Sequence, residues 1–409
     1  MIRLIIRMPT TNEIQENQPI ITINSYGSVA NGKSTLIKIL SGINPMKYKK
    51  EIVKNMTIKL GYINIKIYKC TKCECPKCYQ INNNICENCK EINILILHMS
   101  IIDAPGHNDL QTTALKTIDL VDLCLLLFSS ETSENITIND HYNSLKYYDL
   151  LENTFILHNK IDLISKDLAI EQYQNIKKNF NVKTVIPISA QYGYGIDYLV
   201  QLISEKIKIP TNEEFTNICN LPLKATIIRS FDVNNQNINI DEVLGGVVGI
   251  HIKHGTIKLG DTIEIIPGLI MKDGNAKKIT AVVNSIKTDE TELEIAYPGG
   301  LFGIGLTIDP SLTKNNKLEG NYMTNINNTH FLNYNEATIE LNNKNHQIRI
   351  NTLCTLCIGP LKRNIKIIKH INNTVTFISP LIITSHINEK IVLLLNNKIH
   401  TGGIITNVK

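Results

Sequence analysis

The sequence predicts an α/β domain with a mostly parallel sheet, followed by two antiparallel β-barrel domains. Up to about Pro210, apolar runs of strand length alternate with polar segments of helix length, which is typical of a parallel sheet wrapped by helices. Further on, β-branched runs are separated by glycine, asparagine and proline turns, as in barrels. The length of 409 residues agrees with roughly two to three domains. We expect them at 1–210, 211–325 and 326–409.

Within these domains the apolar pattern locates the elements. The first domain is expected to have strands over 20–24, 94–103, 120–129, 153–159 and 183–189, and helices over 33–41, 140–151, 166–180 and 195–209. The first barrel is expected to have strands over 223–229, 245–252, 262–266 and 278–286. Turns at 342–345 and 372–373 divide the second barrel. Ligands of the parallel sheet should bind at the carboxyl ends of its strands.

Composition excludes several classes of protein. With 43% hydrophobic and 19% charged residues, the chain is not mostly disordered. A net charge of +5 is compatible with a nucleic-acid partner but too small for a histone-like coating of a phosphate backbone. Arg3 and Arg7 interrupt the apolar start, which argues against a secretory signal. The apolar run 120–128 is shorter than the roughly 18 residues that span a bilayer. We expect a cytoplasmic protein without a membrane partner.

A phosphate-binding loop follows the first predicted strand. Residues 27–34 read GSVANGKS, which matches G-x-x-x-x-G-K-[ST] and precedes a predicted helix. Backbone N–H groups of such a loop surround a phosphate, Lys33 reaches the β- and γ-phosphates, and the Ser34 hydroxyl ligates Mg²⁺. A glycine-rich turn before an ordinary helix is the alternative that the flanking strand and helix disfavour. The predicted nucleotide contacts here are Gly27, Ala30, Asn31, Gly32, Lys33, Ser34 and Thr35.

Three further motifs each follow a predicted strand. In the first, Asp103 can hold Mg²⁺ through a water and the Gly106 N–H can sense the γ-phosphate. In the second, 159–162 (NKID), the Asp162 carboxylate accepts from the N1–H and 2-amino groups of guanine. Asn159 is expected at the other edge of the ring and the Lys160 stem along its plane. In the third, 189–191 (SAQ), Ser189, Ala190 and Gln191 approach the base, with the Ala190 N–H near O6. Together the four motifs predict a P-loop GTPase that binds GTP and GDP with Mg²⁺.

For hydrolysis, the sequence offers one candidate residue that could orient water, and it lacks arginine in most of the first domain. His107 follows Gly106 and is placed to orient an attacking water, although packing or a local hydrogen bond would also explain it. Arginine occurs only at positions 3, 7, 229, 349 and 363, so residues 8–228 contain none. An arginine finger within this domain is therefore excluded, and the charge that accelerates hydrolysis should come from a partner. Intrinsic hydrolysis should be slow.

Six of the 10 cysteines lie between Cys70 and Cys89, in CxxC-type pairs. Such clustering in a reducing compartment predicts metal ligation and not a disulfide framework. The best tetrahedral set is C-x2-C-x7-C-x2-C, which would bind structural Zn²⁺ in a knuckle over 70–89. Cys70 or Cys73 could replace one ligand of this set. The four residues of the set are Cys75, Cys78, Cys86 and Cys89.

These residues and several longer stretches resemble one family, the gamma subunits of eukaryotic and archaeal translation initiation factor two, which are relatives of elongation factor Tu. The resemblance covers nearly all of the chain and fades after about residue 325. The matching stretches are 57–62 (TIKLGY), 67–68 (IY), 103–107 (DAPGH), 159–162 (NKID), 230–233 (SFDV), 245–249 (GGVVG), 258–268 (KLGDTIEIIPG) and 307–312 (TIDPSL).

The resemblance implies a GTP-dependent carrier of methionyl initiator tRNA that forms a heterotrimer with alpha and beta subunits and delivers the tRNA to the small ribosomal subunit. A GTPase-activating factor and a guanine-nucleotide exchange factor are implied partners. It also implies that Thr57 is the switch residue, which adds its hydroxyl to Mg²⁺ beside Ser34 and Asp103 only when the γ-phosphate is present. The expected catalytic set is then Lys33, Thr57, Asp103 and His107.

The chain departs from the family at a few positions. Histidine is usual where Ser28 and Asn31 stand, and 130–135 lacks the usual glycine- and asparagine-containing run. The alternatives are a selenocysteine-type elongation factor, which would normally carry a further C-terminal domain, and a non-catalytic scaffold whose GTP site is structural. A zinc-ribbon RNA-binding module is disfavoured because few basic residues surround the cysteines.

Overall fold

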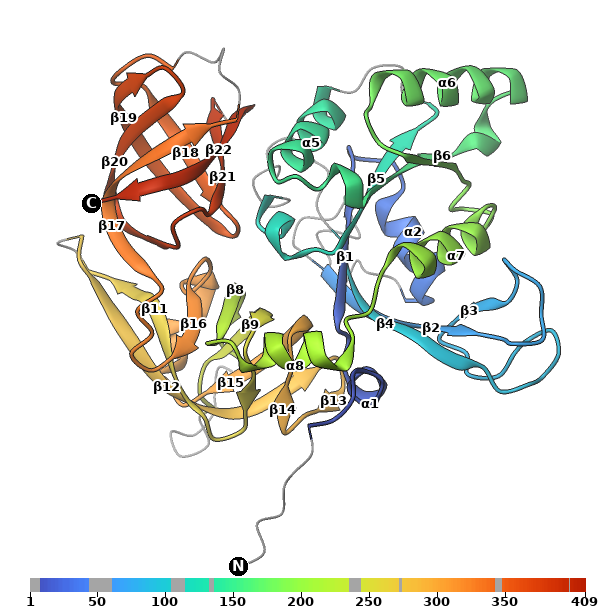
Figure 1. Ribbon diagram of the computed structural model, residues 1–409, viewed down its shortest axis with the longest axis horizontal. Coiled ribbons are helices and arrows are strands. Elements are labelled where there is room, and N and C mark those ends of the chain that lie inside the picture. The colour runs from blue at the N-terminus through green and yellow to red at the C-terminus, as the bar shows by residue number, and fades with distance from the viewer. Residues whose placement is uncertain are drawn as a thin grey trace, which may run out of the picture.

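The computed structural model describes residues 8–43, 61–103, 115–131, 136–234, 244–271, 274–342, 348–396 and 398–409. They form a nucleotide domain built on a seven-stranded sheet and two antiparallel barrels, which lie side by side along the other flank of the molecule (Figure 1). The predicted fold class is confirmed. Among the helices in the described ranges, none has the length and apolar character needed to cross a bilayer.

The sheet of the nucleotide domain has the order β3-β2-β4-β1-β5-β6-β7. Five strands are parallel, and β2 and β3 add an antiparallel edge. The strands are β1 (Ile21–Tyr26), β2 (Gly61–Lys69), β3 (Tyr79–Ile81), β4 (Ile94–Asp103), β5 (Leu123–Ser129), β6 (Thr154–Asn159) and β7 (Thr184–Pro187). The helices are α1 (Thr11–Asn17), α2 (Lys33–Ser41), α5 (Ile136–Tyr147), α6 (Lys166–Asn179), α7 (Ile196–Lys206) and α8 (Asn212–Asn220). Short 3₁₀ turns cover Ile118–Leu120, Leu151–Asn153 and Ile161–Leu163.

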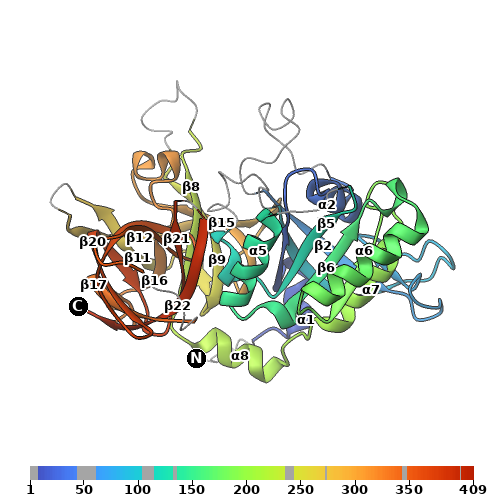
Figure 2. The same ribbon diagram turned by 90° about the horizontal axis from the view of Figure 1, so that it is seen from above.

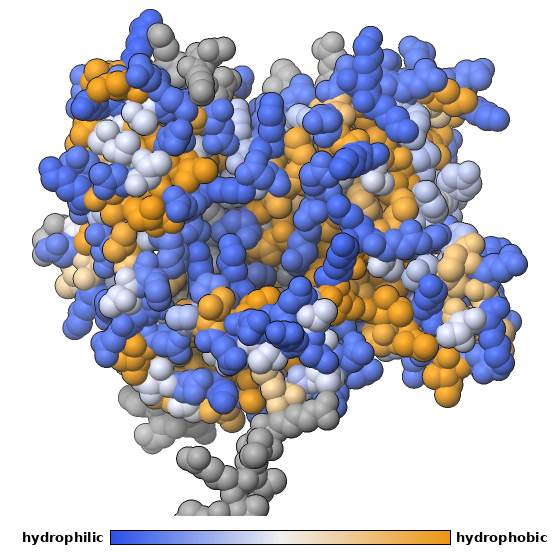
Figure 3. Space-filling view, viewed as in Figure 1, coloured by the Kyte–Doolittle hydropathy of each residue, from blue (hydrophilic) through white to orange (hydrophobic). Residues whose placement is uncertain are grey.

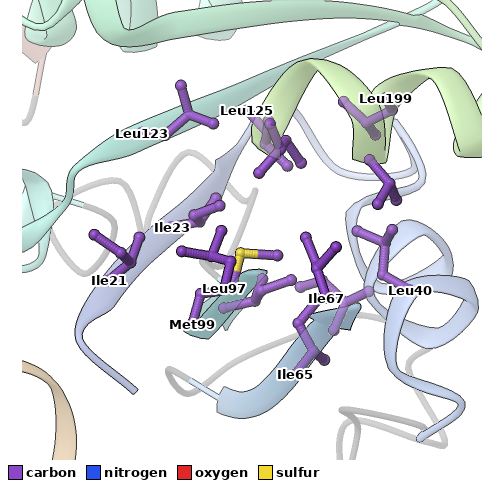
Figure 4. Close-up of a cluster of buried hydrophobic side chains, with 14 of the residues drawn as sticks. Ile21, Ile23, Leu40, Ile65, Ile67, Leu97, Met99, Leu123, Leu125 and Leu199 are labelled. Carbon is purple, nitrogen blue, oxygen red and sulfur yellow. The ribbon is translucent and has the colours of Figure 1, made fainter. Parts of the chain in front are cut away.

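One face of this sheet packs against α2 and α7. Buried isoleucine, leucine and methionine side chains from β1, β2, β4 and β5 meet Leu40 of α2 and Leu199 of α7 (Figure 4). Because both faces of the parallel strands are covered, β5 is apolar at nearly every position. This packing fixes the strand ends, and therefore the loops that follow them, relative to one another.

The first barrel closes because β11 pairs with β12, which joins the two ends of the sheet. Its strands are β8 (Lys224–Phe231), β9 (Val247–His254), β11 (Thr262–Ile270), β12 (Ala276–Thr288), β13 (Thr291–Glu292), β15 (Gly299–Leu306) and β16 (Tyr322–Asn325). A small sheet pairs β10 (Ile257–Lys258) with β14 (Ile295–Ala296). Short 3₁₀ turns cover Pro310–Leu312 and Lys314–Asn316.

The second barrel is the third domain of the chain, and we call it barrel III. It is closed in the order β17-β20-β19-β18-β21-β22. Its strands are β17 (Leu332–Leu341), β18 (Leu353–Ile358), β19 (Leu361–Ile371), β20 (Thr374–Ser385), β21 (Lys390–Leu395) and β22 (Lys398–Val408). Seen from above, barrel III faces α5 of the nucleotide domain (Figure 2). Contacts between α5 and β21 and β22 hold these two parts together.

Three ion pairs join the three domains pairwise. Lys116 pairs with Glu319, and the Lys390 Nζ lies 2.8 Å from Asp149 Oδ2. The third, Lys224 with Glu389, has an N–O distance of 3.2 Å and is buried between the two barrels. It borders a cavity of about 410 Å³ that residues from all three domains line. The nucleotide domain is therefore fixed directly to both barrels.

The junction between the domains also contains a carboxylate, Asp119, whose ionised form is destabilised by burial. Asp119 Oδ1 is shielded from solvent and has no hydrogen-bond donor among the described residues, and a Cβ at Gly359 would meet Asp119 Oδ2 at 2.7 Å. Burial, with Glu389 nearby, raises the pKa of Asp119 from 3.8 to about 6. A pKa raised by folding means that ionisation destabilises the folded protein. This cost is absent well below pH 3.8, grows as the pH rises to about 6 and is constant above that.

We therefore expect Asp119→Asn to raise the free energy of unfolding at pH 7 by roughly 1–3 kcal/mol. The difference should shrink as the pH falls from 6 to 4 and vanish only below about pH 3, where Asp119 is protonated in both states. Urea unfolding followed by circular dichroism at pH 4, 5.5 and 7 measures it, with Asp149→Asn as a control at an exposed partner of Lys390. A variant less stable than the parent at pH 7 would show that nearby Lys224 and Lys253 stabilise the ionised carboxylate.

Candidate nucleotide site

The predicted phosphate loop connects β1 to α2 and has the backbone shape of such loops. Gly32, directly before α2, has φ +92°, and Ala30 has φ +64°. A Cβ at Gly32 would lie 2.3 Å from Asn159 Nδ2, and one at Gly27 would lie 2.7 Å from the Leu127 carbonyl oxygen. Glycine is therefore required at both positions, by close approach as well as by backbone angle.

Lys33 is buried within this loop. Its Nζ donates to the carbonyl oxygens of Gly27 and Ser28, both at 2.8 Å. Burial lowers the pKa of Lys33 to about 8, and nearby Asp103 partly opposes the shift. An anionic phosphate at the loop would favour the charged ammonium further. The residue is thus held where a phosphate loop needs its cation.

Two of the residues predicted to ligate Mg²⁺, Ser34 and Asp103, meet at the start of α2. The Ser34 hydroxyl donates to Asp103 Oδ2 at 2.8 Å, although 69 residues separate them. Asp103 is the last residue of β4 and is buried. Thr35 follows Ser34 in the first turn of the helix. A hydroxyl and a carboxylate oxygen are the hard donors that Mg²⁺ prefers, so these residues fit the ion.

Asn159 links the phosphate loop to the loop after β7. Its Nδ2 donates to the Asn31 carbonyl oxygen at 2.8 Å, and its Oδ1 accepts from the Ala190 N–H at 3.0 Å. The two groups predicted to contact guanine, the Asn159 amide and the Ala190 N–H, therefore bond to each other in this structure. Asn159 is only 2% exposed, so its first role is to set the distance between the two loops.

The rest of the base site lies around the end of β6. Lys160 adopts φ +64° and its Nζ pairs with Glu131. Asp162 is exposed in the turn that follows, so its carboxylate is accessible. Ser189 and Tyr194 exchange two backbone hydrogen bonds of 3.1 Å, which close the loop that carries Ala190 and Gln191. The loop ends where α7 begins.

Two side chains support this arrangement through contacts that the motifs did not predict. Asn31 Nδ2 donates to the Leu127 carbonyl oxygen at 2.7 Å and so ties the phosphate loop to β5. The hydroxyl of Ser130 reaches the carbonyl oxygens of Asn159 at 3.0 Å and Lys160 at 2.5 Å. These partners are distant in sequence, so no local signal could have identified either role. Asn31, which stands where histidine is usual in the family, has a clear structural function here.

Thr57, Gly106 and His107 lie outside the described residues. Their predicted roles as switch residue, γ-phosphate sensor and water-orienting residue stay predictions.

The cysteine knuckle lies between β2 and β4 and gathers a different set of thiols from the one expected. The sulfur atoms of four cysteines lie within 4.8 Å of one another, and these cysteines are Cys70, Cys73, Cys86 and Cys89. The other two, Cys75 and Cys78, are joined to each other by a disulfide. Two members of the predicted ligand set are therefore replaced by Cys70 and Cys73. With three neighbouring pairs, spacing alone could not choose between them.

The backbone explains why these four thiols converge. The Cys70 N–H donates to the Cys78 carbonyl oxygen at 2.8 Å, which continues the hairpin of β2 and β3. This places Cys70 and Cys73 near the turn that carries Cys86 and Cys89. Gln80 of β3 donates from its Nε2 to Cys86 Sγ at 3.3 Å. Backbone N–H groups, that of Cys89 first, lower the pKa of Cys86 to about 6. Four thiols at such distances, one already favoured as thiolate, fit a closed tetrahedral Zn²⁺ site.

The zinc content of variants should depend on the four thiols that lie together, and not on Cys75 and Cys78. We expect the protein to hold one zinc ion, and Cys86→Ser to lose most of it and to unfold locally over the knuckle. Cys75→Ser is the matched control and should keep its zinc, because Cys75 lies outside the four-thiol group. Metal analysis of protein purified under reducing conditions measures both. Zinc lost equally from both variants would return Cys75 to the ligand set.

Comparison with known proteins extends these observations beyond the nucleotide site. Residues 18–209 match the model of the elongation factor Tu GTP-binding domain. The chain is 38% identical over 326 residues to the gamma subunit of eukaryotic translation initiation factor 2 from Encephalitozoon cuniculi, covering 76% of this chain and 73% of that protein. The Schizosaccharomyces pombe gamma subunit is 38% identical over 330 residues, with the same coverage. Subunit 3 of the Drosophila melanogaster factor is 37% identical, with 69% of it covered.

Solved structures of selenocysteine-type elongation factors share the fold. A bacterial selenocysteine-specific elongation factor gives a TM-score of 0.73 at 17% identity over 96% of this chain, which spans 59% of that structure. The elongation factor SelB of Methanococcus maripaludis, bound to a GTP analogue, gives 0.70 at 18% identity and is covered over 80% of its length. Such identities establish the fold alone, whereas the identities to gamma subunits establish the family. The chain belongs to the gamma-subunit family of eukaryotic translation initiation factor 2, whose members are translational GTPases of the elongation factor Tu type.

Proposed function

We propose that the protein is a GTP-dependent carrier of methionyl initiator tRNA, which it brings to the small ribosomal subunit in the cytoplasm. In this proposal it acts within a heterotrimer with alpha and beta subunits of the factor. The observation that supports it most is the identity of 37–38% to gamma subunits over 76% of the chain. The selenocysteine-type factors share the fold at 17–18% identity, which gives that alternative no comparable support.

Hydrolysis in this proposal depends mainly on positioning and charge. Lys33 neutralises charge on the β- and γ-phosphates, and the bond between Ser34 and Asp103 pre-positions two ligands for Mg²⁺. Mg²⁺ held by these residues would supply positive charge that offsets the negative charge of the phosphate oxygens. Thr57 completes its ligands in the GTP state, and His107 orients the attacking water. The charge that accelerates the reaction comes from an activating factor, because residues 8–228 contain no arginine.

The carrier state should depend on the nucleotide. The ends of β2 and β4 meet where Gly61 pairs with Asp103. In the proposed mechanism, a γ-phosphate orders the residues that precede Gly61 and follow Asp103, and this state binds the charged tRNA end tightly. An exchange factor would then replace GDP by GTP for the next cycle.

The test is tRNA binding by the protein reconstituted with its partner subunits. Charged initiator tRNA, deacylated initiator tRNA and charged elongator methionyl-tRNA are compared in filter binding, each with a GTP analogue and with GDP. Selective binding of charged initiator tRNA with the GTP analogue supports the proposal. Equal binding of the elongator tRNA indicates an elongation role, and binding that ignores the nucleotide indicates a scaffold.

A further inference from the structure

Barrel III contains a pocket, lined in part by two cationic residues, that the nucleotide mechanism does not use. The pocket has a volume of about 330 Å³ and lies between β19 and β20, far from the phosphate loop (Figure 1). Its lining residues are Lys362, Arg363, Asn364, Ser379, Pro380 and Leu381. Two of these six are cations, and the described lining includes no acidic residue.

The pocket exists because two adjacent strands separate. The pairing of β19 with β20 runs from Ile371 with Thr374 to Lys366 with Ile378. The described residues 361–365 of β19 form no pairs with β20. β20 also loses its register with β17 between Ile378 and Ile383. In this bulge the Ser379 hydroxyl accepts from the Leu381 N–H at 3.3 Å and donates to its carbonyl oxygen at 2.6 Å. The bulge is thus a fixed structure that holds the two strands apart.

Arg363 lies on the inner side of β19, in phase with the core residues Leu361 and Ile365. Its Nη1 donates to the adjacent Lys362 carbonyl oxygen at 3.0 Å, and its Nε is shielded from solvent with no acceptor. Among the described residues, none forms an ion pair with it, and burial lowers its pKa. A partly buried guanidinium without a counter-charge is costly unless an anion joins it. Arginine at this position is notable in a chain with only five.

Lysines along β19 extend the positive charge on one side of the pocket. Residues 361–385, which contain β19 and β20, include no aspartate or glutamate. Lys362, Lys366 and Lys369 are exposed along β19. At about 3.3 Å per residue, Lys362 and Lys366 lie about 13 Å apart along the strand. In the space-filling view, hydrophilic and hydrophobic side chains are interspersed over this part of the molecule, at the upper left (Figure 3).

We propose that this pocket binds a phosphate-type oxyanion, with Arg363 as the ligand. A guanidinium presents several N–H donors in a plane, which match the oxygens of a phosphate. The ligand can be a free inorganic phosphate or a phosphate of an RNA backbone that runs along β19. Both sources present the same group to Arg363.

The experiment uses the full chain saturated with GDP and Mg²⁺, so that the phosphate loop is filled. With ¹⁵N-arginine labelling, only five side-chain Nε signals arise, and Arg363→Lys identifies the one from Arg363. Inorganic phosphate is titrated in one arm, and a short RNA duplex in the other at two salt concentrations. We expect the Arg363 signal to shift selectively, and Arg363→Gln to weaken binding about tenfold.

Controls keep the result independent of folding. Thermal unfolding shows whether Arg363→Gln retains the barrel, and Lys362→Ala serves as a second, exposed variant that should weaken binding several-fold. Lys398→Ala, at the start of β22 and outside the pocket, should leave binding unchanged. A shift with phosphate alone identifies a free phosphate as the ligand, and a shift with both probes identifies an RNA phosphate. No shift of the Arg363 signal with either probe overturns the proposal.

Discussion

Asp162→Asn should convert the nucleotide site from guanine to xanthine specificity. The exposed Asp162 carboxylate can accept two hydrogen bonds, from N1–H and the 2-amino group of guanine. An asparagine amide accepts with its oxygen but presents donors beside it, which oppose the 2-amino group and match the O2 of xanthine. We expect GDP affinity to fall by about 10³-fold and xanthosine diphosphate affinity to rise by a comparable factor, since a site built for such hydrogen bonds rejects mismatches strongly.

Nucleotide competition against a fluorescent GDP analogue measures both affinities. Asp167→Asn is the matched control, because Asp167 lies in the exposed first turn of α6, only five residues away. The variant should unfold at the same temperature as the parent, since the described structure gives the Asp162 side chain no hydrogen bond or ion pair. Unchanged GDP affinity in Asp162→Asn would mean that the base is read by other groups, and the assignment of the 159–162 motif would be wrong.

The sequence was most informative where a local pattern decides the structure. The predicted strand over 94–103 coincides with β4, and the predicted helix over 33–41 coincides with α2. β2 was not predicted, although Ile63, Ile65 and Ile67 are buried at alternate positions. That strand directly follows the segment that contains Thr57. The missed element was thus recognisable by period alone.

Contacts between distant segments could not be predicted in the same way. The choice of thiols depends on how β2 and β3 turn, and six cysteines in three pairs do not encode that. Asn159 illustrates the same limit within a recognised motif. Its motif predicted a contact with the base, whereas its partners, Asn31 and Ala190, come from loops that only the folded sheet brings together. Motifs identify chemistry, but the second layer of contacts follows from tertiary packing.

Asn159→Ala should therefore damage both stability and nucleotide binding. Removing the side chain leaves the buried Ala190 N–H and the Asn31 carbonyl oxygen without a partner, and each such loss costs about 1–3 kcal/mol. We expect the free energy of unfolding to fall by about 2–4 kcal/mol. GDP affinity should fall by at least 10²-fold, because the phosphate loop and the 189–191 loop are no longer held at a fixed separation.

Two comparison variants separate these effects. Asn153→Ala, an exposed change just before the same strand, should alter neither stability nor GDP affinity. Asn159→Asp keeps an acceptor for the Ala190 N–H but places a carboxylate against the Asn31 carbonyl oxygen. It should therefore displace the phosphate loop more than the 189–191 loop. Saturating GDP should restore part of the lost stability in Asn159→Ala, since the nucleotide binds the folded state alone. If Asn159→Ala instead bound GDP as tightly as the parent, the loops would be positioned by their strands, and the Asn159 link would be dispensable for binding.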